Sequence, residues 1–436
     1  MSQQANVDAM ATLTGLTHDV FKGSVENNVR RRSPASMLYQ EAEQGEYSLE
    51  GQNMVFFADF HFSTGAMATS GWVPDYQGMD AVQGKISPTR RYARVALDNL
   101  IELQASGEGS AEDITDRIFD QLWDKWESME IRHSIGYSSA LIGVVESRTS
   151  STKFILADGY GNSGTSPITH LSKNSIIAWW DLTATAAIDG AAKVDDIDYE
   201  TREVTIDDAA TWEPSQQLDV GDLIYFATTP NISRDYFEAE RNLAPNGLGT
   251  IVDPTGSLTT VHNISETDNG RSKPYRKVSV THDHIELTEF WRKLGIHRGF
   301  PVSPETDCQI AFPSVVDQIA RSLMSLQQQA YTGDVLQGGW KGVKVSGMDI
   351  IEDPFFYHDV SMTVCKDKLK RVVLGGEPDF FSGDGSMWQR ISDYDGKDGF
   401  VGHYMQQFSP FRGAHGALTG IETDLEDDDY LPIPNY

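Results

Sequence analysis

The sequence predicts an α+β fold from three observations. A stretch of the first third of the chain carries apolar residues at helical spacing, stepping by four, four, four and three residues. From about residue 135 the chain consists of short β-branched or aromatic segments separated by Gly, Asp, Pro and Asn, which is typical of strands and turns. Ahead of both, the apolar residues of segment 54–62 alternate with period two and predict a strand.

Length and charge exclude several classes of function. The chain has 436 residues, of which 64 are acidic and 35 basic, so its net charge is −29. This length allows roughly three structural units, or one large unit with insertions. Gripping nucleic acid or an anionic membrane requires an excess of Lys and Arg, so neither is expected as the main role.

Targeting signals are absent from the sequence as it stands. No apolar run approaches the ~20 residues that span a bilayer, and residues 1–23 lack the basic and apolar regions of a signal peptide. Cys308 and Cys365 are too few for a disulfide scaffold or a cysteine metal cluster, so two free thiols are expected. We therefore expect a soluble protein made in a cytoplasm, with no membrane partner.

The first 38 residues are polar and weakly patterned, and they contain the basic run Arg30, Arg31 and Arg32. Such a segment is either disordered or an arm that orders on a partner. The basic run could contact an anionic surface, although three charges on an arm are more often simply solvated.

The next segment predicts a strand with two apolar faces. Val55 and Phe57 lie on one face, and the other face carries Met54, Phe56, Ala58, Phe60 and Phe62. A strand of this kind needs covering on both sides. The stretch 63–85, rich in Gly, Ser and Thr, is too long for a simple connection, so we expect it to be functional or packed against something else.

Two helices are predicted next. Ser87 and Pro88 suit an N-cap and a first helical position, and the apolar spacing predicts a helix over 89–104, although Val95 and Leu97 also fit a strand. Ser110 opens a clearer helix over 110–133, about 37 Å long at 1.5 Å per residue. Its apolar stripe consists of Ile114, Ile118, Leu122, Trp126 and Met129.

The remainder alternates strands with one more helix. Segments 153–159, 202–208 and 222–229 predict strands of a small barrel, with a turn at 220–222. A helix is predicted over 314–329, followed by strands over 343–353 and 360–367 and by an acidic tail.

No catalytic, nucleotide-binding or cofactor motif is found in the sequence. His282 and His284, in the strand-like segment 278–287, could ligate zinc with Asp283 or His297, but packed or partly exposed histidines are the commoner outcome. Segment 393–399 lacks the Gly and Glu of a calcium loop. The tail acids could bind divalent ions weakly, although a solvated charge run is commoner. We therefore expect no enzyme, no cofactor and no metal.

The order of these elements resembles a known family. The resemblance is carried by QGKISPTRRYARVALDNLIELQ, DVGDLIYFA, NGLGTIVDPTGSLTTVHNIS, SGMDIIEDPFFYHDVSMTVCKDKLKRVV and FSPFRGAHGALTGI. In order and texture, residues 40–421 resemble the major capsid protein of tailed bacteriophages, with the Hong Kong 97-type fold. The resemblance rests on the order of the elements along the chain rather than on any single motif.

The resemblance implies a division of the chain. Its parts are an N-terminal arm, 1–38; an extended loop, 39–86; helices of the peripheral domain including the long spine helix, 87–145; a β-rich insertion domain, 146–240; an axial domain, 241–345; and late strands that complete both domains, with the acidic tail, 346–436. The stripe of the spine helix would form its core contact with the sheet of late strands.

The resemblance also implies a function. The chain would be a structural head protein that self-assembles as hexamers and pentamers into an icosahedral shell around the dsDNA genome, without sequence-specific binding. It would be made in the bacterial host cytoplasm and reside in the virion. A scaffolding protein, a portal and a decoration protein would be further partners. The net charge would keep the shell from adhering to its DNA, although a salt-adapted origin would give the same acidity.

In this family the extended loop and the arm contact neighbouring subunits. The residues expected at the subunit interface are Met54, Phe56, Phe57, Phe60, Phe62, Trp72, Arg30, Arg31 and Arg32. Two other classes remain open: an acidic β-rich carbohydrate-acting enzyme, since 64 acids always offer carboxylate pairs, and a phage tail or receptor-binding protein.

Overall fold

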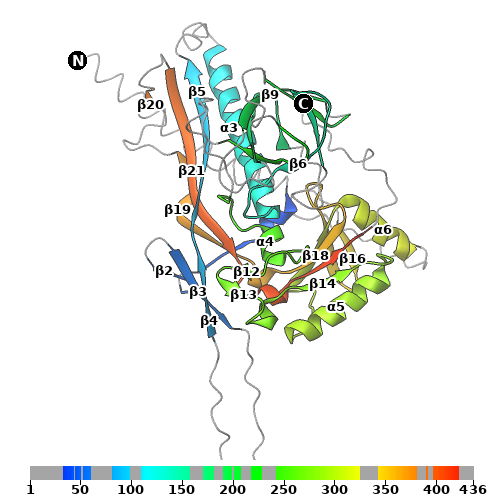
Figure 1. Cartoon of the computed structure of the whole chain (residues 1–436). Helices are drawn as coiled ribbons and strands as arrows, with labels where there is room; N and C mark the ends of the chain where they lie inside the picture. Colours follow the sequence, from blue (N-terminus) through cyan, green and yellow to red (C-terminus); the bar gives the residue numbers. More distant parts are fainter. Residues whose placement is uncertain are drawn as a thin grey trace, which may run out of the picture.

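The computed structural model describes residues 33–43, 45–50, 53–59, 81–98, 110–157, 170–180, 190–198, 201–207, 218–227, 242–324, 342–380, 389–390 and 396–421. Two open sheets, a closed barrel and a small three-stranded sheet are arranged around one long helix (Figure 1). Helices pack on sheets whose strand pairs are mostly antiparallel, which is the α+β organisation that the sequence predicts.

A six-stranded sheet forms the lower right of the molecule in Figure 1. Its strands, in spatial order, are β14 (Tyr275–Val278), β22 (Gly416–Thr419), β18 (Val360–Cys365), β15 (Asp307–Ala311), β17 (Met348–Glu352) and β16 (Gly342–Val345). Successive residues of a strand point to opposite faces, so Ile310 and Ala417 enter one core cluster while Ala311 and Leu418 enter another. Helices α5 (His284–Arg298) and α6 (Pro313–Met324) cover the second face.

A five-stranded sheet forms the long left edge of the molecule in Figure 1. It contains β1 (Gln40–Glu41), β19 (Lys370–Phe380), β21 (Gly396–Phe408), β20 (Gln389–Arg390) and β5 (Thr89–Asp98). Strand β1 runs parallel to β19, whereas β5 is antiparallel to β21 over its whole length.

The helix predicted over 89–104 is wrong for residues 89–98, which form strand β5. The Ser87 hydroxyl donates to Asn53 Oδ1 at 2.7 Å and does not cap a helix. The local pattern fits both periods, and pairing with β21, which lies about 300 residues further along, aligns every residue of the strand with a partner in one antiparallel ladder. This long-range contact decides the conformation.

The predicted helix over 110–133 is confirmed as α3 (Ser110–Ile135). Leu122 and Trp126 are buried, whereas Met129 is half-buried. The side chains of Ile114 and Ile118 lie outside the described part. Trp126 stacks on His403 of β21 with ring centroids 6.0 Å apart, so the helix packs on the five-stranded sheet.

A charged pair also ties α3 to this sheet. The Arg91 guanidinium of β5 forms an ion pair with the Glu130 carboxylate of α3, and both side chains are almost fully buried. The Arg91 guanidinium also lies 5.0 Å from the centre of the Trp126 ring. Removing one partner of a buried pair leaves the other charge without compensation, so the helix and the strand are held in one register.

The predicted barrel is present. Its strands close in the order β10 (Glu203–Ile206), β7 (Lys153–Leu156), β6 (Gly143–Arg148), β11 (Leu223–Phe226), β8 (Ile176–Trp180) and β9 (Gly190–Asp198). The expected turn at 220–222 is confirmed, with Gly221 at φ 96°, a conformation that suits glycine. Trp179 is fully buried inside, and Arg132 of α3 lies 4.6 Å over the Phe226 ring at the barrel surface.

Other predictions are confirmed in part or corrected. Helix α6 confirms the helix from residue 314 to 324, and β16, β17 and β18 confirm the later strands. The strand-like reading of 278–287 is wrong beyond Val278, because Asp283 caps α5 by accepting from the Glu286 N–H. The remaining short elements are α4 (Leu248–Val252), β12 (Thr260–Val261), β13 (Ile264–Ser265), and the 3-10 turns η1 (Pro34–Leu38), η4 (Gly270–Ser272), η5 (Lys366–Lys368) and η6 (Arg412–Ala414).

Within the described part of the chain, no helix combines the length and the apolar character needed to cross a bilayer.

Candidate subunit interface

A three-stranded sheet lies at the end of the molecule opposite the barrel (Figure 1). Its strands are β2 (Ser48–Glu50), β3 (Asn53–Asp59) and β4 (Ala81–Ile86), paired antiparallel in that order. The last described pair of the β3–β4 ladder is Asp59 with Ala81. This sheet holds the described part of the predicted extended loop from Ser48 onward, whereas β1 belongs to the five-stranded sheet.

The two faces of β3 have different environments. Met54, Phe56 and Ala58 are buried with Phe408 and Phe411 in one core cluster. The Phe56 ring lies 4.6 Å from the Phe408 ring and meets the His262 ring edge-on at 5.7 Å, measured between centroids. The structure thus assigns Met54 and Phe56 to the subunit's own core rather than to an interface.

The opposite face of β3 is open at one residue. Phe57 is 70% exposed, and Leu49 on the neighbouring β2 is 61% exposed. An aromatic side chain exposed to this extent, next to a second apolar one, is suited to contact another protein surface. The other aromatic residues expected here, Phe60, Phe62 and Trp72, lie outside the described residues.

Gly84 determines how closely β4 approaches β3. It stands opposite Phe56 in the ladder, and a Cβ atom at this position would overlap the Phe56 ring. Glycine therefore allows the ring to lie flat across the neighbouring strand. This contact fixes the base of the hairpin on the body of the subunit.

His262 also contacts the base of this hairpin. Its carbonyl accepts from the Lys85 N–H at 2.9 Å, and its backbone adopts φ 55°. Burial, followed by the charge of Arg412, lowers the pKa of His262 to about 3, so the ring is neutral at physiological pH. A neutral ring can pack against Phe56 without the cost of burying a charge.

The described end of the predicted N-terminal arm contacts the rest of the subunit. The basic run at residues 30–32 lies outside the described part, but residues 33–38 are packed into the body. The Ser33 hydroxyl and the Ala35 N–H both donate to Asp353 Oδ2 at 3.1 Å. Burial raises the pKa of Asp353 to about 6 although these hydrogen bonds favour the charged form.

A second exposed apolar surface lies along β14 and α5. Val278, Val280, Ile285 and Ile296 are 67%, 86%, 63% and 82% exposed. This surface is not evident from the sequence, because the segment before α5 resembles a strand. The signal that could have revealed it is the outward position of the two isoleucines once Asp283 is recognised as the N-cap.

The candidate metal ligands are not brought together. The His282 ring faces Ser279, the His284 ring faces Ser322, and His297 lies near the other end of α5, where its Nε2 contacts the Lys273 carbonyl. Among the described residues no group of three His, Cys, Asp or Glu side chains could hold a metal ion. Cys308 and Cys365 are free and buried, and burial raises the pKa of the first to about 12 and of the second to about 11.

Comparison with known proteins gives a result from structure alone. No protein-family model matches the sequence, and no curated protein matches it. The cyanophage A-1(L) capsid asymmetric unit contains a chain with a TM-score of 0.50 and 10% identity, covering 88% of this chain and 91% of that chain.

Two further solved structures are similar at lower scores. The satellite phage P4 procapsid including the size determination (Sid) protein has a TM-score of 0.38 and 8% identity, covering 92% of this chain and 90% of that chain. The holo-SrpI encapsulin complex from Synechococcus elongatus PCC 7942 has a TM-score of 0.40 and 7% identity, covering 91% and 90%. The chain therefore shares its fold with a phage capsid protein, as the sequence resemblance predicts.

Proposed function

We propose that this chain is the major capsid protein of a tailed bacteriophage, a non-enzymatic head protein of the virion that is made in the bacterial host cytoplasm. The observation that carries the proposal is the fold shared with the cyanophage A-1(L) capsid chain over 88% of this chain. In this role copies assemble as hexamers and pentamers into an icosahedral shell around the dsDNA genome.

The elements take the following roles in the proposal. Helix α3 is the spine of a peripheral domain, with the five-stranded sheet at its side. The six-stranded sheet with α5 and α6 is the axial domain, and the barrel is the insertion. The proposed domain boundaries are those given by the sequence, and the barrel strands run from Gly143 to Phe226.

The three-stranded sheet is the part proposed to contact a neighbouring subunit. Its base is fixed by Phe56, Gly84 and His262, while Phe57 and Leu49 remain exposed. A rigid base with an exposed apolar face suits a segment that gains its remaining burial from another copy. The segment 60–80, with Phe60, Phe62 and Trp72, and the run Arg30 to Arg32 extend this proposed interface.

The charge of the chain suits a container for DNA. A net charge of −29 repels phosphate, so packaged DNA would not adhere to the shell. The shell would enclose the DNA without sequence-specific binding. A scaffolding protein, a portal and a decoration protein are the further proposed partners.

Shell formation is the decisive experiment. The full chain is expressed alone and together with a scaffolding protein, and the products are examined by negative-stain microscopy and sedimentation. Closed icosahedral particles are expected. A monodisperse monomer or trimer under both conditions, together with turnover of glycans, would instead support the carbohydrate-acting enzyme; a trimer without turnover would support a tail protein.

The extended loop can be tested separately. Because Asp59 pairs with Ala81, residues 60–80 can be replaced by a two-residue Asn-Gly turn that closes the hairpin. The variant is expected to keep its free energy of unfolding but to form no stable shells. A Gly/Ser-rich replacement of the original length is the control that separates loss of side chains from loss of reach. Normal particles from both variants would contradict the loop assignment.

A further inference from the structure

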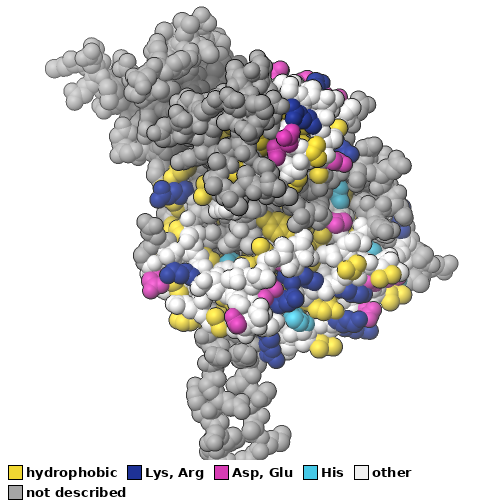
Figure 2. Space-filling model, viewed as in Figure 1, with side chains coloured by type: hydrophobic (Ala, Val, Ile, Leu, Met, Phe, Trp, Pro, Cys, Tyr) yellow, Lys and Arg dark blue, Asp and Glu magenta, His cyan; other side chains and the backbone are white. Residues whose placement is uncertain are grey.

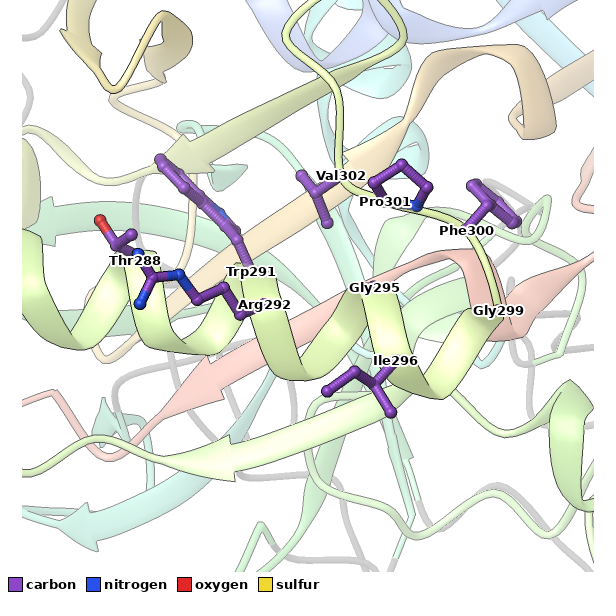
Figure 3. A pocket seen from close by; sticks show the side chains of 9 residues that line it. All are labelled: Thr288, Trp291, Arg292, Gly295, Ile296, Gly299, Phe300, Pro301 and Val302. Carbon is purple, nitrogen blue, oxygen red and sulfur yellow. The ribbon is translucent and has the colours of Figure 1, made fainter.

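A groove of about 570 Å³ runs along the C-terminal half of α5 (Figure 3). One wall is α5 itself, with Trp291 and Ile296, and the other is the segment after the helix, with Phe300, Pro301 and Val302. The groove is mostly apolar and contains an aromatic ring on each side. Such grooves are typical binding sites for extended, proline-containing segments, which lose little entropy on binding.

One cation borders this groove without a partner in the described part of the chain. Arg292 lines the groove and is exposed, and no described hydrogen bond or ion pair uses its guanidinium. The neighbouring cations differ from it: Lys293 pairs with Glu289 at 2.8 Å, and Arg298 is buried against Asp307 at 2.6 Å. Figure 2 shows Lys and Arg side chains beside hydrophobic ones over the lower right of the molecule, where α5 lies. The groove therefore suits an apolar segment that follows carboxylates.

The chain itself contains such a segment. Residues 422–436 include the carboxylates Asp427, Asp428 and Asp429, followed at once by Tyr-Leu-Pro-Ile-Pro at 430–434. The two prolines at alternate positions favour the extended polyproline conformation. The order of the segment, acids first and then apolar residues, matches a groove that has a cation beside its apolar walls.

The groove is within reach of this segment. The last described residue, Ile421, donates its N–H to the Asp359 carbonyl, and Thr419 pairs with Val278 at the end of β14. Helix α5 starts six residues after Val278, and its stretch from His284 to Gly295 is about 16 Å long. The ten residues 422–431 span about 31 Å in a polyproline conformation, so the apolar part can lie along the groove.

We propose that residues 430–434 bind in this groove of their own subunit, with the carboxylates of 427–429 beside Arg292. The C-terminal segment would then cover the apolar walls of α5 and neutralise its unpaired cation. This interaction is independent of the proposed shell function.

A disulfide between engineered cysteines tests the proposal in the full chain. Ile296→Cys in the groove is combined with Ile433→Cys in the segment, and the native thiols do not interfere because they are buried. Brief mild oxidation is expected to give the 296–433 disulfide within one chain, identified by mass spectrometry. The comparison pair is Leu243→Cys with Ile433→Cys, since Leu243 is an exposed apolar residue of another surface.

Further substitutions in the chain that carries Ile296→Cys and Ile433→Cys test whether the binding depends on Arg292 and on the two prolines. Arg292→Glu is expected to lower the yield of the disulfide at least fivefold, whereas Lys293→Glu, an equal change of charge on the next residue, should lower it less than twofold. Replacing both Pro432 and Pro434 by Ala should lower the yield about threefold, and Asn435→Ala should not.

Three outcomes would overturn the proposal. A yield no higher than that of the comparison pair means that the segment does not prefer the groove. Equal effects of Arg292→Glu and Lys293→Glu mean that the unpaired cation is not recognised. A disulfide found mainly between chains, in a mixture of isotope-labelled and unlabelled subunits, assigns the groove to a neighbouring copy.

Discussion

The adjacent residues Phe56 and Phe57 of the three-stranded sheet have opposite environments. The Phe56 side chain is 1% exposed and packs on Phe408, whereas the adjacent Phe57 is 70% exposed. Because alternate residues of a strand point to opposite faces, one ring serves folding and the next is free for contacts with another subunit. Changes at the two positions should therefore have separable effects.

Phe57→Ser should change assembly without changing the fold. Its free energy of unfolding is expected to stay within about 0.5 kcal/mol of the parent, because the side chain is mostly in solvent. Shell yield, measured by sedimentation, should fall severalfold. Phe56→Ala is the control, and it should cost about 3–5 kcal/mol because it empties a packed core site. Unchanged shell yield for Phe57→Ser would argue against this face as an interface.

Asp353, which accepts hydrogen bonds from Ser33 and Ala35, should make the stability of the fold depend on pH. Burial raises the pKa of the folded Asp353 carboxyl to about 6, above the ordinary value of 3.8, so the folded chain holds this proton more tightly than the unfolded chain. The resulting stabilisation is complete below about pH 4 and is lost as the pH rises through 6.

Asp353→Asn should remove this dependence, because an amide does not titrate. Between pH 4 and pH 7 the parent is expected to lose about 3 kcal/mol of unfolding free energy relative to the variant, from a shift of about two pKa units. Urea denaturation of both proteins across this range measures the difference. Parallel pH profiles would show that the carboxyl titrates normally.

At the scale of elements, α5 is held at its N-terminus by the carboxylates of Asp283 and Glu286. The Asp283 carboxylate accepts from the Glu286 N–H at 2.7 Å. The Glu286 carboxylate accepts from the N–H groups of Val280 and His282 and from the Lys277 ammonium. Burial acts to raise the pKa of Glu286, but these hydrogen bonds outweigh it and hold the pKa below its ordinary value. One side chain thus fixes the turn between β14 and α5.

Glu286→Ala should destabilise the chain by about 3 kcal/mol, because several donors in the turn lose their acceptor. Glu289→Ala, one turn later on the same helix, removes only an exposed ion pair with Lys293 and should have a much smaller effect on stability. Thermal and urea denaturation of the two variants provide the test. Similar losses for both would mean that the hydrogen bonds of Glu286 are not what orders this turn.

At the scale of the whole molecule, histidines buried in different parts of the fold together determine how stability depends on pH. Burial lowers the pKa of His170, His262 and His415 to about 3 and that of His282 to about 4, and it lowers the pKa of His133 well below the ordinary value. In His415, the Cys365 N–H donates to Nδ1 at 3.2 Å, which leaves Nε2 as the donor to Ser409 Oγ. The folded chain therefore keeps these rings neutral.

The chain should consequently be labile in acid. Unfolded histidines bind protons below about pH 6.5 and the folded ones do not, so stability is present above that pH and is lost as the pH falls. Each such ring costs about 1.4 kcal/mol per pH unit below 6.5, so the rings together exceed the opposite contribution of the one Asp353 carboxyl. Unfolding free energies measured from pH 7 to pH 4.5 should fall steeply. A flat profile would show that the rings titrate normally in the folded state.

Features that depend on neighbouring residues could be predicted from the sequence, whereas features that depend on distant residues could not. The helix at 110–133, the barrel strands and the turn at Gly221 were predicted because periodicity, β-branched residues and glycine act within a few neighbours. The alternation of segment 54–59 likewise indicated a strand, but not which face would be free. That depended on Phe408, which lies about 350 residues away.

The amino-acid sequence by itself therefore determined the α+β class, the order of the elements, the long helix and the acidic charge. Only the tertiary structure decided that residues 89–98 form a strand, that Phe56 is core while Phe57 is exposed, and that α5 presents a groove bordered by Arg292. The physical reason is that these features depend on partners brought together by folding. A local pattern compatible with two conformations is resolved by the backbone pairing and burial that distant segments supply.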